Sequence, residues 1–73
     1  MIGHDNEATL NTLIATTLDS ADGYRKAAEK AENERYRSLF LEFAGERERC
    51  VRQLQDEVRQ LGGNPEDDGS ILA

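Results

Sequence analysis

The sequence predicts an all-α protein, an antiparallel two-helix hairpin that completes its core by self-association. The helix-breaking residues gather at Gly62-Gly63-Asn64-Pro65, which leaves a long body with few interruptions before them. Apolar residues recur through this body in steps of three and four, as on one side of a helix. A chain of 73 residues is also too short to enclose a large core alone, and its single cysteine allows no internal disulfide.

The first helix is expected from residue 6, after an N-terminal arm of residues 1–5, with Asp5 or Asn6 as its N-cap. Continued beyond residue 31 in the same frame, its apolar stripe would next bury Arg35 and Glu42. Such a core is implausible, so we place a turn near residues 31–33. The stripe of this helix consists of Leu10, Ile14, Thr17, Ala21, Tyr24, Ala28 and Ala31.

The second helix is expected to run from this turn to Gly62. Asn33 is its predicted N-cap, because a short amide accepts hydrogen bonds from the free N–H groups of a first turn. Gly62 is predicted to end the helix in the left-handed conformation. The expected hairpin spans residues 6–62, and residues 63–73 form an acidic tail in which we expect Glu66–Ala73 to be mobile. The stripe of this helix runs through Tyr36, Phe40, Phe43, Arg47, Leu54 and Leu61 and includes Cys50 as a packed core residue.

Each stripe is wider than one partner helix can cover. Two hairpins that pack into a four-helix bundle would bury the remaining apolar surface, so we expect a homo-oligomer and most simply a homodimer. The predicted interface consists of the large apolar residues of both stripes, Leu10, Leu13, Ile14, Leu18, Tyr24, Phe40, Phe43 and Leu54.

The charge balance restricts the class of partner. A formal net charge of -6 disfavours nucleic acid and anionic membrane surfaces. No stretch approaches the roughly 20 apolar residues of a membrane span, and the N-terminus lacks the features of a signal peptide. We therefore expect a cytoplasmic protein, which fits a free Cys50. The apolar end Ile71-Leu72 leaves a protein partner for the tail as an alternative.

Several short motifs occur in order along the chain. They are Leu10-Asn11, Leu13-Ile14, Asp22-Gly23-Tyr24, Ala27-Ala28-Glu29, Leu39-Phe40, Ala44 with Arg47, Leu54 with Glu57-Val58, Leu61-Gly62-Gly63 with Pro65, and Gly69-Ser70. Together they resemble a ferritin-like bacterial family called domain of unknown function 2383. Members of this family are usually about twice as long and continue into a third and a fourth helix, so the chain is similar to the first helical hairpin. The resemblance implies that a second copy supplies the missing helices, and it implies no activity, because the family has no assigned role.

A di-iron site of the ferritin-like kind would need a Glu-x-x-His pair that points into the bundle. Arg47 and Cys50 occupy the corresponding positions, and the only histidine, His4, lies before the expected first helix. We therefore favour a non-enzymatic, self-associating helical module without a cofactor. The alternative is a metal-binding or ferroxidase-like protein with iron or manganese held between subunits, and its candidate ligands are Asp19, Asp22, Glu42 and Glu46.

Arg47 interrupts an apolar stripe and requires a partner, because burial of an unpaired guanidinium is costly. A hairpin that turns near residue 32 brings position 47 beside position 19. We therefore predict a structural ion pair between Asp19 and Arg47, with Arg47 reaching out to solvent as the alternative.

Overall fold

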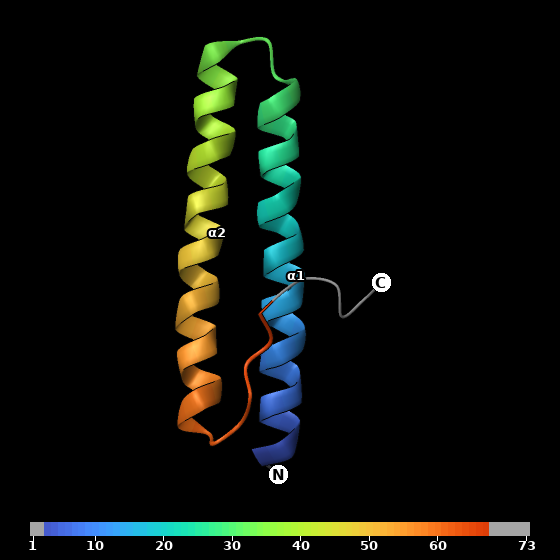
Figure 1. Ribbon diagram of the computed structural model, residues 1–73, viewed down its shortest axis with the longest axis vertical. Coiled ribbons are helices and arrows are strands. Elements are labelled where there is room, and N and C mark those ends of the chain that lie inside the picture. Colours follow the sequence, from blue (N-terminus) through green and yellow to red (C-terminus); the bar gives the residue numbers. More distant parts are fainter. Residues whose placement is uncertain (1–2, 68–73) are drawn as a thin grey trace.

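The computed structural model describes the backbone of residues 3–67 and the side chains from residue 6. Helix α1 (Gly3–Lys30) and helix α2 (Glu34–Gln60) lie side by side and run in opposite directions (Figure 1). No strand occurs between residues 3 and 67. The prediction of an all-helical chain with two helices packed on each other is thus confirmed.

Helix α1 begins at Gly3, three residues earlier than we expected. His4 therefore belongs to the helix and not to an N-terminal arm, and Asp5 and Asn6 lie inside the first turns instead of before them. Polar and acidic residues suit this position, because the N-terminal end of a helix carries partial positive charge.

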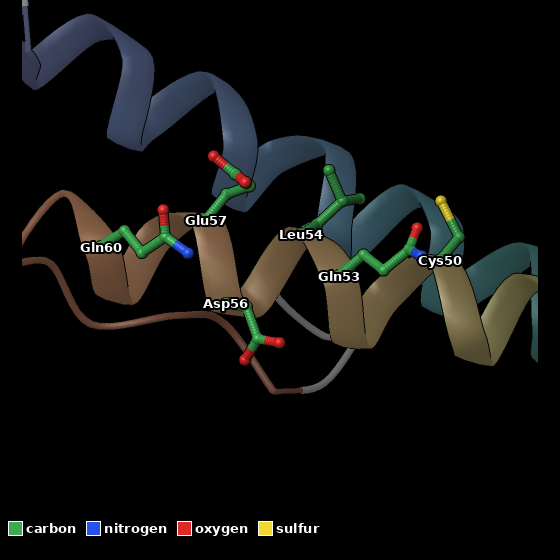
Figure 2. Close-up of a pocket in the computed structure, with 6 residues that line it drawn as sticks. All are labelled: Cys50, Gln53, Leu54, Asp56, Glu57 and Gln60. Atoms are coloured by element: carbon green, nitrogen blue, oxygen red, sulfur yellow. The ribbon is translucent and has the colours of Figure 1, made fainter.

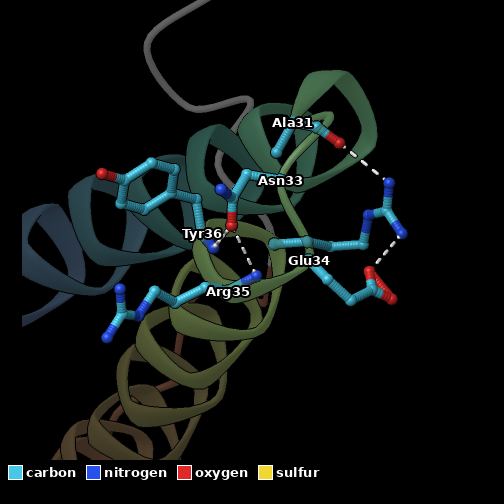
Figure 3. Close-up of polar contacts among 6 residues, drawn as sticks. Ala31, Asn33, Glu34, Arg35 and Tyr36 are labelled. Carbon is cyan, nitrogen blue, oxygen red and sulfur yellow. Dashed lines mark hydrogen bonds and ion pairs between the residues drawn. The ribbon is translucent and has the colours of Figure 1, made fainter.

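The turn spans residues 31–33, where the shift of the apolar stripe placed it. Asn33 is the N-cap of α2, as predicted, with an extended backbone at φ -91 and ψ 123. Its side-chain oxygen accepts hydrogen bonds from the backbone N–H of Arg35 at 2.8 Å and of Tyr36 at 3.4 Å (Figure 3). These bonds satisfy N–H groups that have no partner within the helix.

Arg37 ties this turn to the end of α1. Its guanidinium donates to the carbonyl of Ala31 at 2.8 Å and pairs with Glu34 at 2.6 Å. A cation beside the C-terminal end of a helix is favourable, because the last carbonyls carry partial negative charge. One side chain therefore links both helix ends at the turn.

Helix α2 ends in the left-handed glycine that the sequence predicted. Gly62 has φ +83, and its N–H donates to the carbonyl of Arg59 at 2.9 Å. The N–H of Gly63 donates to the carbonyl of Val58 at 3.0 Å, which completes a Schellman motif. The chain reverses at this point because only glycine adopts this conformation without a steric cost.

The interior of the hairpin is built from small side chains. Its largest buried cluster consists of Ile14, Val51 and Val58, and Leu10, Leu18 and Leu54 pack against this cluster while partly exposed. Towards the turn the contact between the helices is made by alanine. We call the line of buried residues along the helix contact the seam: Ile14, Ala21 and Ala28 of α1 with Ala44, Val51 and Val58 of α2.

The chain after α2 runs back along α1 (Figure 1). We call residues 63–67 the strap. The Asn11 amide donates to the carbonyl of Asn64 at 3.1 Å and accepts from the N–H of Glu66 at 2.7 Å, and Gln55 donates to the carbonyl of Glu66 at 2.9 Å. The backbone of Glu66, the first residue of the segment expected to be mobile, is thus hydrogen-bonded to both helices. Residues 68–73, which include Ile71-Leu72, lie outside the described residues.

No helix between residues 3 and 67 is long and apolar enough to cross a membrane.

Two glycine substitutions test this account of the backbone with opposite signs. Gly62→Ala should lower the free energy of unfolding by about 1 kcal/mol, because an L-residue is strained in the left-handed conformation. Gly23→Ala should raise it by about 0.5–1 kcal/mol, because Gly23 is helical and a Cβ there meets no atom within 4 Å. Urea unfolding followed by circular dichroism measures both, and equal effects of the two changes would contradict this assignment.

Candidate functional site

Helical geometry divides the hairpin into two broad faces on either side of the seam. Successive residues lie about 100° apart around a helix, so neighbours such as Tyr24 and Arg25 fall on opposite faces. Tyr24 contacts Phe40 and Phe43 of α2 on one face. Arg25 forms an ion pair with Glu48 of α2 on the other face. We call these the apolar face and the polar face.

An aromatic cluster marks the turn half of the apolar face. The Tyr24 ring lies 5.3 Å from the Phe43 ring centroid in an edge-to-face arrangement and 6.4 Å from that of Phe40. The guanidinium carbon of Arg47 lies 5.6 Å from the centroid of the Tyr24 ring. This is a cation–π contact, which stabilises an arginine without a carboxylate partner. All four side chains are only partly buried.

The rest of the apolar face consists of apolar residues that the hairpin does not cover. Leu13 is 46% exposed and Tyr36 54%. Both helices form the face, so it exists only when the hairpin is closed. Its members are Leu10, Leu13 and Tyr24 of α1, Tyr36, Phe40, Phe43, Arg47, Cys50 and Leu54 of α2, and Leu61 just after α2.

A surface hollow of about 510 Å³ lies at the edge of this face. Figure 2 shows Cys50, Leu54 and Glu57 projecting from one side of α2, while Asp56 points away from them. The remaining lining residues are Gln53 and Gln60. The hollow is open and is lined by one leucine together with mostly polar groups. It is therefore better suited to contact with a side chain of another protein than to enclosing a small-molecule ligand.

Cys50 is exposed, which corrects the expectation that it packs in the core. It directly precedes Val51, a seam residue, and so lies about 100° around the helix from the seam. The structure thereby places a free thiol on the apolar face, outside the hairpin's own core.

The polar face carries the strap and the interhelical ion pair. Arg25 bridges Asp22 of its own helix at 3.1 Å and Glu48 of α2, with both partners of the interhelical pair partly exposed. Such exposed pairs contribute little stability each. The strap amides Asn11 and Gln55 lie on this same face, and neither was identified from the sequence as a functional residue.

Asp19 and Arg47, the predicted ion pair, are not brought together. Asp19 is exposed and lies about 140° around α1 from Ile14, so its carboxylate faces away from α2. Among the residues that the structure describes, the ion pairs are Arg25–Asp22, Arg25–Glu48, Arg37–Glu34 and Arg59–Asp56. Arg47 instead uses the face of the Tyr24 ring.

The four carboxylates of the metal alternative come as one pair on each helix, Asp19 with Asp22 and Glu42 with Glu46. Asp19, Asp22, Glu42 and Glu46 are all exposed. In the described part of the chain, no group of three or more histidine, cysteine, aspartate or glutamate side chains has an arrangement that would hold a metal ion.

The predicted interface residues divide between the core and the apolar face. Ile14 is fully buried in the single hairpin. Leu18 is partly buried against the core cluster and lies on the polar side of the seam, about 60° around α1 from Ala21. Leu10, Leu13, Tyr24, Phe40, Phe43 and Leu54 all lie on the apolar face.

This geometry defines a class of protein, a two-helix hairpin with one apolar face that its own chain leaves uncovered. A family model described as a domain of unknown function (DUF2383) matches residues 5–73. The chain therefore belongs to the DUF2383 family, as its motifs predicted. No curated protein and no solved structure matches it.

A double-mutant cycle tests the contact of Arg47. Tyr24→Leu and Arg47→Met should show a coupling free energy of about 0.5–1 kcal/mol in chemical unfolding, because each change removes the same cation–π contact. Asp19→Asn and Arg47→Met should be additive within about 0.5 kcal/mol. If Arg47→Met instead coupled to Asp19→Asn and was additive with Tyr24→Leu, Asp19 and not Tyr24 would be the partner of Arg47.

Proposed function

We propose that this protein is a non-enzymatic, self-associating helical module in which the apolar faces of two copies pack together into a ferritin-like four-helix bundle. The observation that carries the proposal is the sorting of side chains by size. Alanine and valine fill most of the seam, while leucines, tyrosines and phenylalanines line the apolar face. Because the large apolar side chains lie on an exposed face, this hairpin can bury much of their surface only when it associates with another chain.

The dimensions of the hairpin support the same proposal. The chain has a mass of 8.2 kDa and exposes 5171 Å², whereas a compact monomer of this mass exposes about 4,500 Å². Its radius of gyration is 14.2 Å, against about 11 Å for a compact chain of this length. The excess surface is roughly 600 Å², close to the roughly 800 Å² that each partner contributes to a standard interface.

A second copy suits the apolar face better than an unrelated partner does. Both helices contribute apolar residues along the length of the face, and a two-fold axis sets such a patch against itself. The carboxylates Asp19, Glu42 and Glu46 lie on the outer sides of the helices, and Glu57 projects beside Cys50 and Leu54 at the edge of the face. Arg47 on this face is already engaged by Tyr24.

The single thiol fits this proposal in a cytoplasmic setting. Cys50 is exposed on the hairpin, and reducing conditions would keep it free of intermolecular disulfides until the apolar faces meet.

Two exposed leucines provide a test of the face. Leu13→Lys should abolish association, because it places a charge in the apolar face, where Leu13 is 46% exposed. Leu41→Lys should leave association intact, since Leu41 is 51% exposed on the polar face. Sedimentation velocity over a range of concentrations measures both variants. A monomeric wild-type chain, or equal loss of association in both variants, would overturn the proposal.

The Cys50 thiol provides an independent measurement. Its alkylation by iodoacetamide should slow by at least about tenfold when the protein is concentrated enough to associate, because a buried thiol reacts only after dissociation. The Leu13→Lys variant should react at the same rate at every concentration. A wild-type rate that never changes with concentration would place Cys50 outside the contact.

A further inference from the structure

The strap is bound through its main chain by one amide side chain from each helix. Asn11 of α1 makes two bonds, to the carbonyl of Asn64 and the N–H of Glu66, and Gln55 of α2 makes a third, to the carbonyl of Glu66. The strap also passes close to α1 at Gly63, where a Cβ would overlap the Glu7 carboxylate. The strap thus connects the two helices at the open end of the hairpin, opposite the turn.

Each of these amides directly follows a leucine of the opposite face. Leu10 precedes Asn11, and Leu54 precedes Gln55. Neighbouring residues on a helix point about 100° apart, so Leu10 and Leu54 lie on the apolar side of the seam while the amides lie on the polar side. Both leucines pack against the core cluster of Ile14, Val51 and Val58.

We infer that the strap is a clamp for the apolar face, through which Asn11 and Gln55 fix the spacing of Leu10 and Leu54. This inference rests on the proposed function and adds its regulation, because it makes association depend on a segment that does not touch the partner. Asn11 and Gln55 are positioning residues, since they act through the helices that carry the face.

The physical basis is the population of a binding-competent hairpin. Apparent affinity falls in proportion to the fraction of molecules whose face is ordered, and in a homodimer this fraction enters once for each copy. A strap variant that leaves the open end ordered in about one third of molecules therefore weakens the dimer about tenfold. The turn closes the other end through Asn33 and Arg37, so the effect is confined to the strap end.

The test compares the dimer dissociation constant of the wild-type chain with that of Asn11→Ala/Gln55→Ala, measured by sedimentation equilibrium. Hydrogen–deuterium exchange of the same samples reports whether residues 63–67 are released. Thr12→Ala is the control, because Thr12 is an exposed polar residue of α1 that directly follows Asn11 and lies on the outer side of the helix, about 160° from Ile14. Asn33→Ala is the control for general destabilisation, because it removes the cap at the turn end.

The expected result is a dissociation constant raised at least tenfold in the strap variant, with faster exchange in the strap and in residues 7–14 and 54–61. Thr12→Ala should lie within twofold of wild type, and Asn33→Ala should have a clearly smaller effect than the strap variant. If the double variant does not fold, Gln55→Ala, which loses a single bond, is measured in its place.

Three results would overturn the inference. An unchanged dissociation constant with the strap released would show that the strap does not order the face, while the self-associating function would stand. An equal effect of Asn33→Ala would assign the loss to general stability. A wild-type chain that stays monomeric at every concentration would overturn the proposed function as well.

Discussion

The close contact of two helices along small side chains is the constraint on which the rest of this structure depends. Ala21, Ala28 and Ala44 near the turn, with Val51 and Val58 towards the open end, allow little space between the helices. Large side chains have no room in such a contact, because packed interiors have few voids and little tolerance for added volume. They are therefore displaced to its edges, where Tyr24, Phe40 and Phe43 gather beside the seam.

Local signals predicted most of the backbone. A frame shift in the apolar stripe placed the turn, Asn33 predicted a cap, and Gly62 predicted a left-handed end, because each effect depends on residues within one or two turns. The predicted start of α1 was less accurate, because polar residues are common both at the N-cap of a helix and in its first turn.

The choice between two overlapping stripes of α2 was not predictable in the same way. Ala44, Val51 and Val58 recur every seven residues, and Phe40, Arg47 and Leu54 recur at the same interval beside them. Spacing alone does not say which line meets α1, and the larger residues made the second line look like the core. The structure selects the smaller side chains, which explains both the exposure of Cys50 and the contact of Arg47 with the Tyr24 ring.

The position of the strap could not be predicted from the sequence, because its contacts are distant in the chain and involve the backbone. Asn11 lies 53 residues from Asn64, and the contact is made to main-chain atoms that every residue possesses. An asparagine or a glutamine on a helix surface is an ordinary feature, so no pattern singles these two out. The candidate metal ligands show the opposite difficulty. Carboxylates are common on outer helix faces, so a sequence readily suggests a set of ligands without any arrangement that would bind a metal.

The reversal of the chain at Gly62 has a consequence for how the hairpin displays whatever is joined to it. Asn11 and Gln55 hold the strap on the polar face, on the other side of the seam from the apolar face. Two hairpins packed through their apolar faces would carry their straps on opposite outer surfaces. A domain fused after the strap would then project outward from each copy. The two fused domains of a dimer would be separated by the thickness of two helical layers.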